Sequence, residues 1–155
     1  MVMNKDSGFA GLDEQLCFAV YAASHAFNAA YRPLLQPHGL TYPQFLVLLV
    51  LWEKGSCNLN ELGVRLHLDS GTLTPLVKRM EAAGLVHRQR SREDERHLLV
   101  KLTDRGEELR PLSRTVRKAM LCALGGQVEP VLKLREQLMN ATEQLRAAPH
   151  LNAAK

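Results

Sequence analysis

Apolar residues recur at intervals of three and four along most of this chain, a spacing that predicts a mainly helical fold. The first such stretch covers residues 12–35, and its apolar positions fall on one side of a helix. Pro33 and Pro37 are expected to weaken and then stop this helix, because proline lacks the backbone N–H that a helix needs. Two stretches near the other end, residues 104–124 and 128–145, repeat the pattern on either side of a glycine pair.

The centre of the chain is predicted to contain three shorter helices. Thr41, with Gln44 three residues later, is a capping pattern that begins the first of them. Its body, residues 45–52, is almost entirely apolar, so we expect it to be buried. Asn58 and Glu61 repeat the capping pattern at the start of the second helix. The core face of that second helix is predicted to consist of Leu59, Leu62, Val64 and Leu66.

The third central helix, residues 70–83, has one apolar side and one side that suits DNA. The exposed side is small and polar at its start and cationic further along, which favours close approach to base edges and phosphates. Pro75 would remove a helical hydrogen bond if Ser70 were the N-cap, so we predict a later start with Thr72 as the cap. Free amides at that start would favour a phosphate. The buried side is predicted to consist of Leu73, Leu76, Val77 and Met80.

A charged hairpin is predicted to follow these helices. Residues 86–90 and 97–102 are strand-like and flank a charged tip, residues 91–96. A helix-turn-helix followed by a basic hairpin is the layout of a winged helix-turn-helix, in which one helix enters a major groove. We therefore predict a DNA-binding lobe over residues 41–103. The basic residues of the first strand and tip that point to DNA binding are Arg88, Arg90 and Arg92.

The end helices carry more apolar surface than one small core can cover. We therefore predict a homodimer built from residues 12–36 and 104–147. A two-fold dimer would place two recognition helices about 34 Å apart, one turn of DNA, which predicts a palindromic operator on double-stranded DNA. The whole chain, residues 1–155, is predicted to be a single domain, mainly α with a small β-wing.

Composition adds little to this picture and excludes some classes of protein. The formal charge of +4 and the pI near 9.1 fit a nucleic-acid partner. No apolar run reaches the length of about 18 residues that a membrane helix needs, and the acidic start differs from a secretory signal, so we expect a cytoplasmic protein without a membrane partner. The three cysteines are then expected to be thiols. The histidines and cysteines have no metal-ligand spacing, so we expect no metal, no cofactor and no catalytic residues.

Several motifs together resemble the MarR family of transcription regulators, over roughly residues 12–146. The matching segments are Leu40-Thr41-Tyr42-Pro43-Gln44-Phe45, Leu59-Asn60-Glu61-Leu62-Gly63, Gly71-Thr72-Leu73-Thr74-Pro75-Leu76-Val77-Lys78-Arg79-Met80-Glu81, Asp94-Glu95-Arg96 and Leu102-Thr103-Asp104-Arg105-Gly106. Within that family the chain resembles the organic hydroperoxide resistance regulators (OhrR), repressors that sense peroxides through a cysteine near the start of the first helix. The segment similar to their sensing site is Leu16-Cys17-Phe18, followed by Tyr21, Tyr31 and Tyr42.

The resemblance implies which residues face DNA. Asp94 and Arg96 would set the wing tip, and Arg96 would reach into the minor groove. The residues implied to face the groove from the recognition helix are Ser70, Gly71, Thr72, Thr74, Pro75, Lys78 and Arg79.

The resemblance also implies that Cys17 is the thiol that reacts with peroxide and that Tyr31 and Tyr42 donate hydroxyls to it. Tyr21, four residues after Cys17, shares its helix face. Tyr31 is fourteen residues on, roughly 21 Å along a helix, so a hydrogen bond to Cys17 must come from a partner chain. In the two-cysteine subgroup a second, resolving cysteine lies in the fifth helix, where this chain has Cys122.

These observations predict a repressor that senses organic hydroperoxides by oxidation of Cys17 to a sulfenic acid, followed by a disulfide with Cys122 and release of the operator. One alternative keeps the DNA-binding lobe but has a small aromatic acid as the releasing ligand, with Cys17 merely lining a pocket. A second alternative is a thiol peroxidase, which leaves the arginine-rich hairpin unexplained. Cys57 matches nothing in the sensing site.

Overall fold

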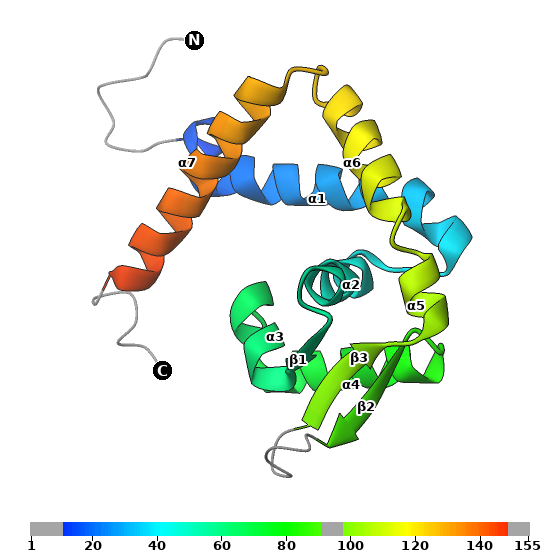
Figure 1. Cartoon of the computed structure of the whole chain (residues 1–155). Helices are drawn as coiled ribbons and strands as arrows, with labels where there is room; N and C mark the ends of the chain where they lie inside the picture. The colour runs from blue at the N-terminus through cyan, green and yellow to red at the C-terminus, as the bar shows by residue number, and fades with distance from the viewer. Residues whose placement is uncertain (1–10, 91–97, 149–155) are drawn as a thin grey trace. The chain divides into compact units, whose positions relative to one another are not determined.

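The computed structural model describes residues 11–90 and 98–148, and it is mainly helical with one small sheet, as predicted (Figure 1). The chain divides into two compact units, Met1–Ser113 and Arg114–Lys155. The elements, in chain order, are η1 (Leu12–Glu14), α1 (Leu16–Leu35), η2 (Gln36–His38), α2 (Tyr42–Lys54), β1 (Ser56–Asn58), α3 (Leu59–Leu66), α4 (Ser70–Ala82), β2 (Val86–Arg90), β3 (Leu98–Leu102), α5 (Asp104–Glu108), α6 (Leu112–Ala123) and α7 (Val128–Ala147).

The core of the first unit is built around α2. This helix begins as predicted, with the Thr41 backbone N–H donating to Oε1 of Gln44 at 2.8 Å. Inside the helix, the indole Nε1 of Trp52 donates to the carbonyl of Gly106 at 3.0 Å, which joins α2 to α5. The side chains that α2 buries are Gln44, Phe45, Val47, Leu48, Val50, Leu51 and Trp52. The prediction that residues 45–52 form a buried helix is therefore confirmed.

The sheet has three antiparallel strands in the order β1-β3-β2, one more than the predicted hairpin. The additional strand, β1, has only three residues, and it places Cys57 opposite Val100. A segment this short shows no alternation of apolar and polar residues, so its pairing with β3 could not be predicted from the pattern. Arg88 of β2 is also opposite Val100, on the other side of β3.

The helix-turn-helix is formed by α3 and α4. Asn58 caps α3 as predicted, because its backbone N–H donates to Glu61 Oε2 and its Oδ1 accepts from the Glu61 N–H, both at 2.9 Å. One predicted core residue of α3 is wrong: Val64 is 75% exposed, whereas Leu62 is fully buried. Val64 lies two residues after Leu62, about 200° around a helix, and therefore on its opposite face.

The first helix begins later than predicted. Residues Leu12–Glu14 form a 3-10 turn, and α1 begins at Leu16. Pro33 lies inside α1, which continues for only two more residues and ends at Leu35. No single helix of the described chain is long and apolar enough to cross a membrane, and one bent pair, Leu16–His38 with Tyr42–Lys54, meets that test together.

The prediction of one long helix over residues 104–124 is wrong, because the chain forms α5 and α6 with a break between them. Pro111 lacks the N–H that a continuous helix would direct at the Glu107 carbonyl. The chain instead makes shorter turns, in which Arg110 donates to Glu107 at 2.9 Å and Leu112 donates to Leu109 at 2.9 Å.

The second unit consists of most of α6 and all of α7, with a turn at Gly125 and Gly126. Both glycines have positive φ, 94° and 74°, and end α6 as predicted. No residue of α7 is buried. The large apolar side chains that it leaves exposed are Val128, Leu132, Leu134, Leu138, Met139 and Leu145.

Candidate functional site

The predicted recognition helix is α4, and its start differs from the prediction. The N-cap is Asp69, whose carboxylate accepts from the Thr72 backbone N–H and from the Thr72 hydroxyl, both at 2.9 Å. Neither Ser70 nor Thr72 is the cap, and Pro75 is the sixth helical residue. The hydrogen bonds from Thr72 lower the pKa of the Asp69 carboxyl. The Thr72 N–H therefore donates to the Asp69 carboxylate, whereas the amides at the start of this helix were expected to be open to a phosphate.

The two faces of α4 are those that the periodicity predicts. Leu73, Leu76, Val77 and Met80 are all buried, which fixes the helix on the core of the first unit. Thr74 is half-buried. The other candidate DNA-binding residues of this helix are exposed, namely Ser70, Gly71, Thr72, Pro75, Lys78 and Arg79. They form one small, polar and cationic surface, and their role in DNA binding stays a prediction.

The base of the wing is joined to α4 by an ion pair. The Arg88 guanidinium donates through Nε to Glu81 Oε2 at 2.8 Å, and Nη2 lies 2.7 Å from the same oxygen. The Arg88 backbone N–H donates to Glu81 Oε1 at 3.0 Å. Arg90, the last residue of β2, is exposed. The remaining candidate wing residues, Arg92, Asp94 and Arg96, lie outside the described residues.

The segment that begins α5 holds the turn after α4. This segment was among the family motifs, but its contact with α4 was not predicted. The Thr103 hydroxyl donates to the Gly84 carbonyl at 2.6 Å, and the Thr103 backbone N–H donates to the Leu85 carbonyl at 3.1 Å. Arg105 Nη1 donates to the Ala83 carbonyl at 3.0 Å. These contacts satisfy the carbonyls of the turn that follows α4.

Two of the three cysteines are exposed, and they are the two candidate redox residues, Cys17 and Cys122. Cys17 is the second residue of α1. Tyr21 is also exposed, and its ring contacts His25 edge-on, with 4.4 Å between the centroids. Cys17 and Tyr31 lie in the same unbroken helix, which separates them by roughly 21 Å at about 1.5 Å per residue. A single chain therefore does not bring the Tyr31 hydroxyl to the Cys17 sulfur.

The structure does bring Tyr31 and Tyr42 together. Their ring centroids lie 4.4 Å apart, at the junction between α1 and α2. Burial raises the pKa of both phenols, and the neighbouring Tyr42 raises that of Tyr31 further. Both hydroxyls therefore keep their protons at neutral pH and are able to donate hydrogen bonds.

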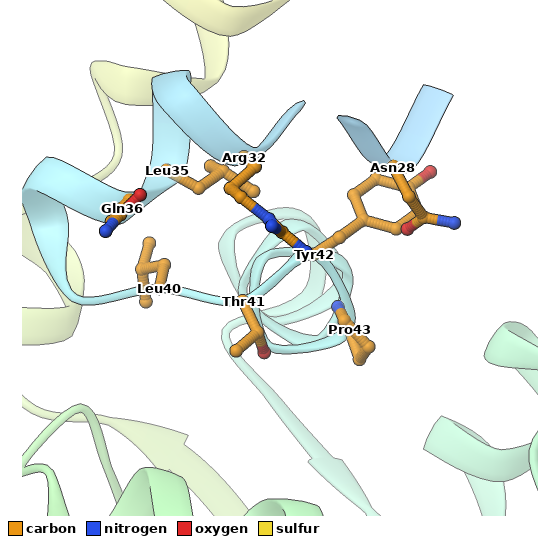
Figure 2. A pocket seen from close by; sticks show the side chains of 8 residues that line it. All are labelled: Asn28, Arg32, Leu35, Gln36, Leu40, Thr41, Tyr42 and Pro43. Atoms are coloured by element: carbon orange, nitrogen blue, oxygen red, sulfur yellow. The ribbon is translucent and has the colours of Figure 1, made fainter. Parts of the chain in front are cut away.

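A pocket of about 510 Å³ lies beside this tyrosine pair, between the C-terminal half of α1 and the start of α2 (Figure 2). Figure 2 shows Arg32 extending from α1 towards Tyr42, and Asn28 lying beside the Tyr42 ring. The remaining lining residues are Leu35, Gln36, Leu40 and Pro43. The pocket thus combines one cation, two amides and two hydroxyl groups with apolar walls.

Cys57 differs from the other cysteines because it is buried in β1. Burial, reinforced by the Glu61 carboxylate, raises the pKa of its thiol from 9.0 to about 11. At pH 8 this difference leaves about a hundredfold less reactive thiolate than an ordinary cysteine has. Iodoacetamide is therefore expected to label Cys17 and Cys122 in the folded, reduced protein and Cys57 only after denaturation. Peptide mass spectrometry checks this, and labelling of all three at similar rates would contradict it.

Among the residues that the structure describes, no group of three or more histidine, cysteine or carboxylate side chains is placed to hold a metal ion. The described site is therefore made of a cationic surface on α4 with its attached hairpin, two exposed thiols and a pair of phenols.

Comparison with known proteins identifies this arrangement. The sequence profile of the family described as "Transcriptional regulator SarA/Rot" matches residues 29–110. The chain is 50% identical over 145 residues to the HTH-type transcriptional regulator TtmR of Methylorubrum extorquens (strain PA1), covering 92% of this chain and 71% of the relative. It is 42% identical over 134 residues to the organic hydroperoxide resistance transcriptional regulator of Bacillus subtilis (strain 168), covering 86% and 91%.

Solved structures of one relative, AbfR of Staphylococcus epidermidis, extend the comparison. Reduced AbfR bound to DNA is 38% identical to this chain, with a TM-score of 0.71 over 86% of this chain and 94% of that one. A disulfide form of AbfR is similar with a TM-score of 0.60, at 38% identity over 84% and 91%. The family and these relatives are transcriptional regulators, and none is named as an enzyme. The chain therefore belongs to the SarA/Rot group of MarR-like winged-helix transcriptional regulators, DNA-binding proteins, within the branch of organic hydroperoxide resistance regulators.

Proposed function

We propose that this protein is a homodimeric repressor that senses organic hydroperoxides through Cys17 and releases a palindromic operator when Cys17 is oxidised. It would act in the cytoplasm, where its DNA target lies. The observation that carries the proposal is the placement of an exposed thiol at one end of α1 and of two protonated phenols, Tyr31 and Tyr42, at the other end. A second copy of α1, running antiparallel, would bring the phenols of one protomer to the thiol of its partner.

The uncovered apolar surface supports the dimer. Leu12 of η1 and Leu16 and Val20 at the start of α1 are exposed, as are six large apolar side chains of α7. Exposed apolar surface of this extent marks an interface in a folded protein. We propose that residues 12–36 and 104–147 form that interface. A two-fold dimer of this kind would place its two recognition helices about 34 Å apart, which is the spacing of two successive major grooves.

The proposed chemistry has two steps. The Cys17 thiolate attacks the distal oxygen of the hydroperoxide, the O–O bond breaks, and the alcohol leaves with one proton, so Cys17 becomes a sulfenic acid. The Cys122 thiol of the partner then attacks the sulfenic sulfur, which forms a disulfide and releases water. A disulfide requires the two Cα atoms to lie within about 7 Å. Closing it would draw the end helices together and change the separation of the two α4 helices.

The named forms of a relative support a disulfide as part of the switch. AbfR has been solved reduced on DNA and also with a disulfide formed. A gel shift with DNA upstream of this protein's own gene tests the proposal. The reduced protein is expected to bind, cumene hydroperoxide to release the DNA, and a dithiol reductant to restore binding. Binding that survives excess hydroperoxide would refute the redox switch while leaving DNA recognition intact.

The pocket beside Tyr42 favours a second candidate, release by a small aromatic carboxylate. Arg32 would pair with the carboxylate, and Asn28 with the Thr41 and Tyr42 hydroxyls would bind polar substituents. DNA release by salicylate from a Cys17→Ser protein would support this function, and loss of that release in a Cys17→Ser, Arg32→Gln protein would assign it to the pocket. The absence of salicylate-dependent release would leave the redox switch as the remaining mechanism.

A further inference from the structure

The Glu81–Arg88 ion pair joins the two DNA-binding elements of the lobe. Glu81 lies in the last turn of α4, and Arg88 lies in the middle of β2. Both carboxylate oxygens of Glu81 are engaged, one by the Arg88 backbone N–H at 3.0 Å and the other by the guanidinium Nε at 2.8 Å and Nη2 at 2.7 Å. A fork of this kind fixes direction as well as distance, because the guanidinium is planar.

This pair lies close to the turn between α4 and β2, where a small change in the angle between the two elements would move the whole wing. The turn from α4 to β2 is short and already fixed, since Gly84 donates to the Glu81 carbonyl at 2.9 Å and Leu85 donates to the Met80 carbonyl at 3.0 Å. Beyond the turn, the Glu81 carboxylate holds the backbone of Arg88 to the helix. Arg88 in turn pairs with Val100 of β3, so the position of β2 also sets that of the second strand of the wing.

We infer that Glu81 and Arg88 act as a clamp that sets the angle of the wing relative to the recognition helix, and that Arg88 is a positioning residue rather than a DNA contact. The inference rests on DNA binding through α4 and the wing. The Arg88 side chain is 26% exposed and that of Glu81 33%, so the pair lies partly out of solvent and is screened less than a surface pair. The Arg88 hydrogen bond lowers the pKa of the Glu81 carboxyl, which keeps the carboxylate ionised down to acidic pH.

A simpler reading of the charges gives the opposite prediction, which makes the clamp testable. If Arg88 bound a phosphate, Glu81 would compete with DNA for it, and removing the Glu81 charge would strengthen DNA binding. If the pair is a clamp, the same change releases the wing and weakens binding. Arg88→Lys separates the readings as well, because lysine keeps a positive charge for a phosphate but cannot form the planar fork.

The test measures the Kd of the reduced, full-length protein for a duplex that the wild-type protein selects from a random library, at several salt concentrations. Glu81→Gln and Arg88→Lys are each expected to weaken binding about tenfold. Glu53→Gln is the matched control. Glu53 also pairs with an arginine, Arg65, at 2.5 Å, and its loss changes the net charge equally without touching the wing. The control is expected to stay within about twofold of the wild type.

Hydroxyl-radical footprinting supplies the readout that a loss of stability alone would not produce. In both clamp variants the outer flanks of the site, which the wing covers, are expected to lose protection while the centre keeps it. Wild-type or tighter affinity in either variant, or an even loss of protection across the whole site, would overturn the clamp. Only reduced protein is used, so the result does not depend on whether Cys17 is a sensor.

Discussion

A Cys17→Ser protein is expected to remain on its DNA at hydroperoxide concentrations that release the wild-type protein completely. Serine has nearly the same size as cysteine, and position 17 is exposed, so the change should leave folding and DNA affinity unaltered. The hydroxyl cannot be oxidised to a sulfenic acid, so the first step of the proposed switch is lost. A titration with cumene hydroperoxide, followed by gel shift or fluorescence anisotropy, measures the difference.

The remaining cysteines are matched controls for this result. A Cys122→Ser protein is expected to form the sulfenic acid and, without the second thiol, to keep its DNA and become overoxidised in excess peroxide. A Cys57→Ala protein should release DNA normally, because its thiol is buried and has a pKa of about 11. Mass spectrometry without reductant should find a Cys17–Cys122 link in the wild-type and Cys57→Ala proteins and not in the Cys122→Ser protein. Release from Cys122→Ser equal to that of the wild type would make Cys122 a bystander.

A Gly106→Ala protein is expected to lose about 3 kcal/mol of its free energy of unfolding, because its Cβ would make the closest contact of any described glycine. A Cβ on Gly106 would lie 2.2 Å from the Leu85 carbonyl oxygen and 3.0 Å from Leu102 Cδ2. The backbone cannot move away, because the Gly106 N–H donates to the Thr103 hydroxyl at 3.1 Å and its carbonyl accepts from Trp52 at 3.0 Å. Urea unfolding followed by Trp52 fluorescence measures the loss.

Gly11→Ala provides the control for this substitution. Gly11 has a φ of −63°, which alanine adopts readily, and no atom lies within 4 Å of the position of its Cβ. Its effect should stay within about 0.5 kcal/mol. Both variants are compared with the wild type at one protein concentration, since the proposed dimer would couple stability to concentration. A loss below about 1 kcal/mol in Gly106→Ala would show that the α5–β2 contact yields more easily than its geometry indicates.

The parts of the fold that could be predicted from sequence are those that local spacing determines. The buried face of α4 and the Asn58 cap depend on residues three or four apart, and both predictions are confirmed. The start of α4 was predicted wrongly because Pro75 was expected to lie in the first turn, whereas Asp69 caps the helix and Pro75 is its sixth residue. The break at Pro111 was missed because the apolar stripe continues across it, and only the lost hydrogen bond at the proline ends the helix.

The residue types of the candidate site could be predicted from the sequence, but the side chains that each residue contacts could not. Arg88 was interpreted as one of a run of wing cations, yet its carboxylate partner lies seven residues earlier, across the turn between α4 and β2. The Tyr31–Tyr42 contact joins two helices at a bend whose angle the sequence does not specify. The pocket beside it was not predicted, because Asn28 and Arg32 share only a helical spacing of four residues.

The hydrogen bonds around Gly106, Thr103 and Arg105 have a mechanical consequence. They attach α5 to the turn after α4 and to the last turn of α2, so these helices would have to break hydrogen bonds to shear past one another. The nearest discontinuity along the chain is Pro111, just beyond α5. A signal arriving from further along the chain would consequently turn this block as one rigid body, leaving the contour that meets the double helix undistorted.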